Sequence, residues 1–94
     1  MSTVVVGGYE WDRDKAAENF AKHRVSFEDA IDALEDEAAV ELADLAHPDR
    51  AVTIGFDQRA RILVVVTTER GDRTRIISAR KATNHEESIY ASGE

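Results

Sequence analysis

The chain has 94 residues, no cysteine, one proline and a formal net charge of −7 at pH 7. This length suits one compact domain, and the lack of cysteine excludes disulfides, thiolate catalysis and cysteine-ligated zinc, as in a reducing cytoplasm. The apolar runs are too short for a membrane span and no signal peptide is visible, so we expect a cytoplasmic protein without a membrane partner. Taken as an average, the acidic charge argues against nucleic acid as a partner.

The first predicted elements are a leader, a short strand and a helix. Residues 1–8 are expected to form a flexible leader, followed by a single domain over residues 9–94. Residues 9–11 have the composition of a short strand. Asp12 then caps a helix that runs to about His23, because an Asp side chain accepts hydrogen bonds from the free backbone N–H groups of a first helical turn.

The middle of the chain changes from a helical to an alternating apolar pattern. A second helix is predicted from Ser26, which resembles the start of a capping box with Asp29, and it is expected to end near residues 35–37. From residue 38 the alternation favours strands, which are rich in Val, Ile and Thr. The predicted strands cover residues 38–44, 50–57, 61–70 and 73–79.

The last two strands are expected to form a hairpin. Gly71-Asp72 suits a two-residue turn because glycine accepts a positive φ. In that register the facing pairs are Arg70 with Arg73, Thr68 with Arg75, and Val66 with Ile77.

A third helix closes the predicted fold. Thr83 and Glu86 form a full capping box that opens a short C-terminal helix. The expected fold class is therefore α+β: two N-terminal helices, an antiparallel sheet of about four strands and a short C-terminal helix.

The charge is distributed unevenly along the chain. Residues 1–49 carry four basic and thirteen acidic side chains, whereas residues 50–94 carry eight basic and six acidic ones. All eight of those bases lie within residues 50–81, against three acids, which gives this stretch a charge of +5. Since the Debye length at physiological salt is about 8 Å, such a stretch can bind phosphate on an acidic protein. The alternative is that these arginines are ordinary solvent-facing residues of amphipathic strands.

The segment RTRIISARK, residues 73–81, is the richest in phosphate-binding side chains. A guanidinium group donates two parallel N–H bonds to a phosphate and stabilises the charge that develops on it during RNA cleavage. Strict alternation places Arg73 and Arg75 on the face opposite Arg80. All three converge only if the strand twists, ends early or contains a bulge.

RNA cleavage also requires groups that move protons. His23, at the end of the first helix beside Lys22, is the leading candidate, and a plain helix-capping role is its alternative. Glu69, at a strand end, is the lesser candidate. The three scattered histidines, without cysteine, predict no metal site.

Several short motifs in a fixed order resemble the BrnT family of toxins over about residues 9–91. They are YEWD at 9–12, Lys15, Asn19, KH at 22–23, VSFEDA at 25–30, Arg50, IG at 54–55, RIISAR at 75–80, AT at 82–83, Glu86 and Tyr90. The resemblance implies a compact fold similar to RelE-type toxins. It also implies a ribonuclease that needs no metal or other cofactor and that inhibits translation by cutting RNA.

The resemblance implies partners as well. These are an RNA substrate and a cognate antitoxin, BrnA, whose DNA-binding part contacts operator DNA, so the toxin meets DNA only indirectly. A hetero-oligomer with the antitoxin is the expected assembly.

Carried onto this chain, the basic and polar motif residues of the family fall on Lys22, His23, Arg50, Arg75, Ser78 and Arg80. We expect Arg75 and Arg80 to hold the scissile phosphate, and His23 or Glu69 to transfer a proton. The expected further RNA-phosphate contacts come from Lys22, Arg50, Ser78 and Lys81.

The chain also departs from the family pattern. Arg24 stands where the family usually has glycine, and residues 84–87 are less basic than its terminal helix often is. An alternative function is therefore a non-catalytic module that keeps the toxin fold and binds the antitoxin without cleaving RNA. A third interpretation of the sequence is a nuclease that uses a divalent metal.

Overall fold

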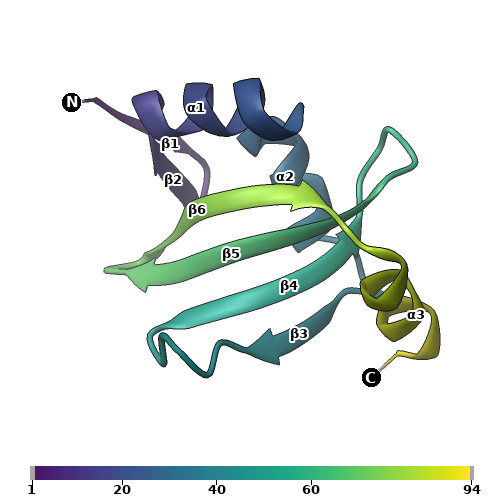
Figure 1. Ribbon diagram of the computed structural model, residues 1–94. Coiled ribbons are helices and arrows are strands. Elements are labelled where there is room, and N and C mark those ends of the chain that lie inside the picture. Colours follow the sequence, from purple (N-terminus) through teal and green to yellow (C-terminus); the bar gives the residue numbers. More distant parts are fainter. Residues whose placement is uncertain (1, 94) are drawn as a thin grey trace.

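The computed structural model describes residues 2–93, which form three helices and one six-stranded sheet (Figure 1). The predicted α+β class is confirmed. In chain order the elements are β1 (Thr3–Val6), β2 (Tyr9–Asp12), α1 (Arg13–His23), α2 (Phe27–Leu34), β3 (Val40–Ala43), β4 (Arg50–Phe56), β5 (Ile62–Arg70), β6 (Arg73–Lys81) and α3 (Asn84–Ser92). Among residues 2–93, no helix combines the length and the apolar character needed to cross a membrane.

The sheet is larger than the four antiparallel strands that were predicted. Its strand order is β1-β2-β6-β5-β4-β3, and β2 runs parallel to β6 while all other neighbours are antiparallel. The flexible leader predicted for residues 1–8 is also corrected, because Thr3–Val6 pairs with β2 as a strand. Three consecutive valines have high strand propensity, and they pair with an edge of β2 that would otherwise lack a partner.

A β-bulge divides β6 into two halves. Arg70 faces Arg73 and Thr68 faces Arg75, as predicted, but Val66 pairs with Ser78 and not with Ile77. The extra residue restarts the alternation, so that Ile76 and Ala79 are both buried. Arg75, Ser78 and Arg80 consequently share one face of the sheet, which is the convergence that strict alternation forbids.

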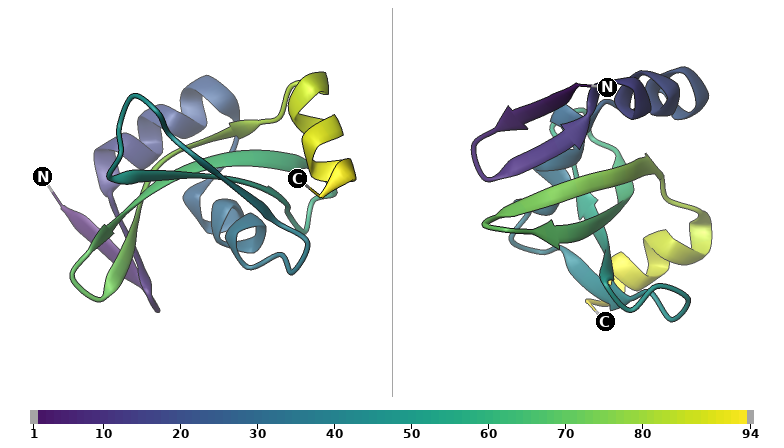
Figure 2. Two further views of the ribbon diagram at one scale, coloured as in Figure 1. Left: turned by 90° about the horizontal axis from the view of Figure 1, so that it is seen from below. Right: turned by 90° about the vertical axis from the view of Figure 1, so that its left-hand side faces the viewer.

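The helices lie at three different places around the sheet. α2 packs on one face, here called the α2 face, whereas α1 and α3 lie at the margins of the other, the open face (Figure 2). The core forms on the α2 face, where Trp11 and Phe27 meet edge to face with ring centroids 5.8 Å apart. Gly55 allows α2 to pack closely, because a Cβ at this position would lie 2.1 Å from the carbonyl oxygen of Ala33.

Candidate functional site

A row of polar side chains crosses four strands on the open face. The strand register aligns Arg50 on β4 with Thr68 on β5, Arg75 on β6 and Glu10 on β2. Above this row lies a cavity of about 320 Å³, here called the arginine cavity. Its polar lining consists of Asp12, Lys15, Arg50, Thr68, Arg70 and Arg75.

Glu10 forms ion pairs with three arginines at the edge of this cavity and orients one of them, Arg75. Its side chain is only 8% exposed, and one carboxylate oxygen lies 2.5 Å from Nη1 of Arg75. The guanidinium groups of Arg70 and Arg73 lie 3.8 and 3.9 Å from the same carboxylate. A buried carboxylate that serves three arginines limits their mutual repulsion and holds Arg75 in one orientation.

A second hollow continues from the arginine cavity along α1. It has a volume of about 210 Å³ and lies between α1 and β6; we call it the histidine groove. Lys15 and Ile77 line both hollows, so the two are contiguous. The polar lining of the groove consists of Lys15, Glu18, Asn19, Lys22, His23 and Ser78.

Asn19 fixes the width of the histidine groove by joining α1 to the edge of β6. Its Nδ2 donates to the carbonyl oxygens of Val25 and Ala79, at 3.0 and 2.8 Å, and its Oδ1 accepts from the backbone N–H of Ala79 at 3.1 Å. The amide thus replaces the strand partner that β6 lacks beyond its short pairing with β2. As a result, α1 runs beside β6 and its polar side faces the open face.

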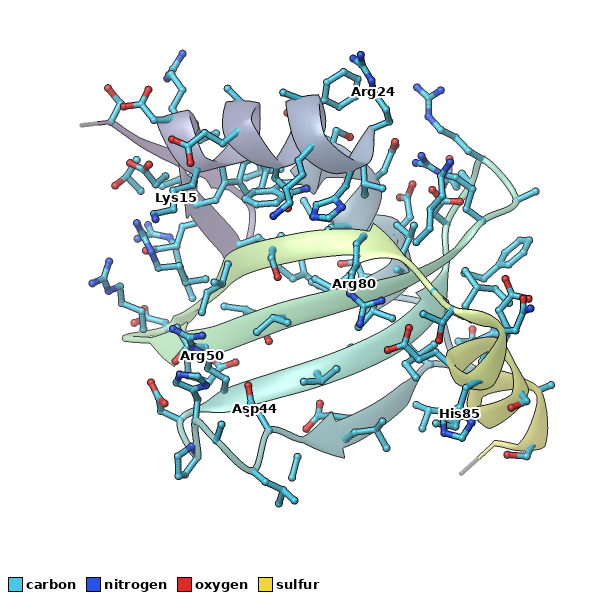
Figure 3. The ribbon with its side chains drawn as sticks, in the orientation of Figure 1. Lys15, Arg24, Asp44, Arg50, Arg80 and His85 are labelled. Carbon is cyan, nitrogen blue, oxygen red and sulfur yellow. The ribbon has the colours of Figure 1, made fainter. Side chains whose placement is uncertain are left out.

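The histidine groove follows α1 from Lys15 to His23, and the arginine cavity adjoins it at the Lys15 end. Lys15 is in the first turn and Arg24 directly follows the last (Figure 3). The helix has 11 residues. At the usual rise per residue, its ends are roughly 16 Å apart, which is more than a single phosphodiester spans. The structure therefore brings Arg50 and Arg75 together at one end, and Lys22, His23 and Ser78 at the other.

Arg80 lies on the open face but lines neither hollow. Its two terminal nitrogens donate to the two carboxylate oxygens of Glu86, both at 2.8 Å. This paired hydrogen bond is the main reason why the pKa of Glu86 falls from its ordinary value of 4.5 to about 2, and it raises the pKa of Arg80. Arg80 thus ties β6 to the first turn of α3.

Two residues predicted for the site lie elsewhere. Glu69 is on the α2 face, where its carboxylate accepts a hydrogen bond from the Thr74 hydroxyl at 3.1 Å. It lines a separate hollow of about 480 Å³ with Asp36 and Glu41. Lys81 lies at the end of β6, in a hollow beside α3. Alternation along a strand explains both positions, because neighbours of open-face residues point to the opposite side.

Sequence reasoning missed several residues of the arginine cavity. Lys15 was identifiable from the sequence, since it recurs with Asn19 and Lys22 on the polar side of the predicted helix. Thr68 was also identifiable, through its predicted pairing with Arg75. Glu10 was not identifiable from the sequence, because its contact with Arg75, 65 residues further along the chain, depends on the parallel pairing of β2 with β6.

Comparisons with known proteins identify the family. The family model described as ribonuclease toxin, BrnT, of type II toxin-antitoxin system matches residues 11–86. No match was found among curated proteins. The crystal structure of the Brucella abortus ribonuclease toxin BrnT is similar to this chain, with a TM-score of 0.65 and 28% sequence identity over 79% of this chain and 94% of that one. This chain therefore belongs to the BrnT family of ribonuclease toxins of type II toxin-antitoxin systems.

Proposed function

We propose that this protein is a metal-independent endoribonuclease that binds RNA on the open face and inhibits translation by cutting it. The observation that carries the proposal is the arginine cavity, in which four cationic side chains from three strands and α1 surround one space. These are Lys15, Arg50, Arg70 and Arg75. Such a cluster offers a binding site for the phosphate of an RNA backbone on a protein whose net charge is negative.

The cavity supplies the electrostatic part of the reaction. Arg50 and Arg75 would donate N–H bonds to the non-bridging oxygens of the scissile phosphate, on which negative charge builds up in the transition state. Glu10 preorients Arg75 for this contact. Removing a single preorganised donor of this kind commonly slows an enzyme by about 100-fold or more.

The histidine groove would bind the adjoining part of the same RNA strand. Lys22, His23 and Ser78 line it, and it opens into the arginine cavity at Lys15. Because eight residues of α1, a rise of about 12 Å, separate His23 from Lys15 at the edge of the cavity, His23 and Arg75 would act on different nucleotides. Arg80 would contribute a phosphate contact only when Glu86 releases it.

One feature supports cleavage without a metal ion. The cationic side chains of the arginine cavity provide the positive charge that a metal would otherwise bring to the phosphate.

The partners follow from the family. A type II toxin implies a protein antitoxin. We propose that it is of the BrnA type, that it forms a hetero-oligomer with this chain in the cytoplasm, and that operator DNA contacts only the antitoxin. A likeness to RelE-type toxins is part of the same proposal.

Incubating the purified protein with total RNA, with and without EDTA, tests the activity. We expect cleavage that survives EDTA. Arg75→Lys retains the charge beside Glu10 but loses the paired donors, so we expect it to fold and to cleave about 100-fold more slowly. Arg59→Ala is the matched control, because Arg59 is 72% exposed and lies on the loop between β4 and β5.

Other results would change the proposal in distinct ways. Cleavage that EDTA abolishes would contradict metal independence. A folded wild-type protein that never cleaves RNA but binds its antitoxin would favour the non-catalytic module. The ion pairs of Arg75 with Glu10 and of Arg80 with Glu86 are the observations in favour of that second function.

A further inference from the structure

Asp12 has one carboxylate oxygen that its structural role leaves unused. Oδ2 accepts the backbone N–H of Lys15 at 3.0 Å and so caps α1. Oδ1 is buried and has no hydrogen-bond partner anywhere in residues 2–93, and no other buried side-chain N or O atom of these residues shares this state. A buried carboxylate oxygen without a donor is costly, so this oxygen calls for an explanation beyond the cap.

The position of Asp12 limits the kind of ligand that can satisfy it. The residue is 7% exposed and lines the arginine cavity beside Lys15 and Arg75. A phosphate oxygen cannot pair with Oδ1, because both are acceptors and both are negative. A hydroxyl group can pair with it once the carboxylate rotates about χ2 and turns this oxygen toward the cavity. The ribose 2′-hydroxyl of RNA lies directly beside the phosphate that the cations would hold.

We propose that Asp12 is a catalytic residue that accepts the proton of the RNA 2′-hydroxyl through Oδ1. The 2′-oxygen then forms a bond to phosphorus, and the bond from phosphorus to the 5′-oxygen breaks. The leaving 5′-oxygen takes a proton from water, and Asp12 returns its proton to solvent. The products are a 2′,3′-cyclic phosphate and a 5′-hydroxyl end, with no net gain or loss of atoms. This inference rests on the proposed function.

Three other groups are excluded as the proton acceptor by their positions or contacts. The Glu10 carboxylate is occupied by three arginines. Glu69 is on the α2 face, and His23 is at the far end of α1. Asp12 is the carboxylate of this chain that both lines the cavity and has a free acceptor oxygen within the described part of the chain.

Substitution by Asn and Ser separates catalysis from capping, because both cap helices about as well as Asp. We expect Asp12→Asn and Asp12→Ser to keep the thermal midpoint of the wild type, and Asp12→Asn, whose amide oxygen still accepts from the 2′-hydroxyl, to keep its RNA affinity as well. We expect their turnover number to fall at least about 100-fold, as for the loss of a general base. The matched control is Ser26→Ala, which removes the cap of α2 and should lower the thermal midpoint without lowering the turnover number.

A second measurement needs no variant. Wild-type protein should bind an RNA oligonucleotide several-fold more tightly than DNA of the same sequence, and its cleavage products should end in cyclic phosphate. Equal RNA and DNA affinity, products without cyclic phosphate, or a folded Asp12→Asn protein with wild-type turnover would each overturn the role of Asp12. In those cases cleavage by the wild type and its loss in Arg75→Lys would leave the proposed function standing. A wild-type protein that cleaves no RNA would overturn both.

Discussion

Single residues show where this chain carries local strain. Arg24 has φ of 59°, in the left-handed region, and its backbone N–H caps α1 by donating to the carbonyl oxygen of Phe20. This conformation suits glycine, which explains why a glycine at this position fits the turn between α1 and α2. The guanidinium group of Arg24 lies 5.6 Å from the centre of the Phe20 ring, a contact that offsets part of the strain.

Replacing Arg24 tests this balance. Arg24→Ala keeps the left-handed backbone but loses the contact with Phe20, so we expect a lower free energy of unfolding than in the wild type. Arg24→Gly removes the steric strain, and we expect it to be more stable than Arg24→Ala by about 1 kcal/mol. Urea denaturation of the three proteins measures the difference. Equal stability of the Gly and Ala variants would show that the backbone here carries no such strain.

At the scale of elements, two polar contacts hold α3 against the sheet. Arg80 and Glu86 link its first turn to β6. The Tyr90 hydroxyl donates to Asp36 at 2.6 Å and links its last turn to the loop after α2. This hydrogen bond is the largest cause of the raised pKa of Tyr90. None of the residues of α3 is buried, and these two contacts attach its first and last turns to the rest of the fold.

The Arg80–Glu86 pair makes stability depend on pH. The pKa of Glu86 is about 2 when folded and 4.5 ordinarily, so ionised Glu86 stabilises the fold above pH 4.5, and this contribution is lost as pH falls toward 2. We expect Glu86→Gln to lower the free energy of unfolding by about 1 kcal/mol at pH 7 and to have almost no effect near pH 2. Glu87→Gln, on the same turn, is the control. A difference that persists unchanged at low pH would contradict the assignment.

The same pair separates the two roles considered for Arg80. If Arg80 binds RNA phosphate, Arg80→Ala should abolish growth arrest on induced expression, whereas Glu86→Gln, which removes the ion pair and one of the two acceptors, should retain it. If Arg80 only anchors α3, both variants should weaken the toxin alike. Growth curves with parallel measurement of the folded fraction distinguish these outcomes. Undiminished toxicity of a folded Arg80→Ala protein would remove Arg80 from the proposed site.

At the scale of the whole molecule, the net charge of −7 conceals a separation of charge. The cations of the arginine cavity lie on the open face, while Glu69, Asp36 and Glu41 line a hollow on the α2 face. An RNA strand is therefore attracted to one face of the molecule and repelled by the other at low salt. This arrangement permits oriented binding but limits its overall strength.

The salt dependence of RNA binding follows from this separation. Arg50 lines the cavity and forms no ion pair within residues 2–93, so its charge is available to a phosphate. We expect Arg50→Gln to weaken binding to all RNA sequences alike and to reduce the slope of log affinity against log salt by about 0.7. Titrations of labelled RNA at several salt concentrations measure the slope, with Arg59→Gln as the control. An unchanged slope would show that Arg50 contacts no phosphate.

The amino-acid sequence alone determined the features that depend on neighbouring residues. The caps at Asp12, Ser26 and Thr83 and the pairing of Thr68 with Arg75 were predicted and are present. These signals act over a few residues, through backbone N–H groups and the twist of a tight turn, so a short stretch contains all the information they need.

Only the tertiary structure decided which distant residues share a site. The parallel pairing of β2 with β6 brings Glu10 beneath Arg75, and the bulge in β6 moves Ser78 and Arg80 to the open face. The same alternation places Glu69 and Lys81 away from it, against the prediction. Strand partners and bulges are set by the packing of the whole sheet against α2. A contact between residues 65 positions apart, such as that of Glu10 with Arg75, produces no pattern in the sequence from which it could be predicted.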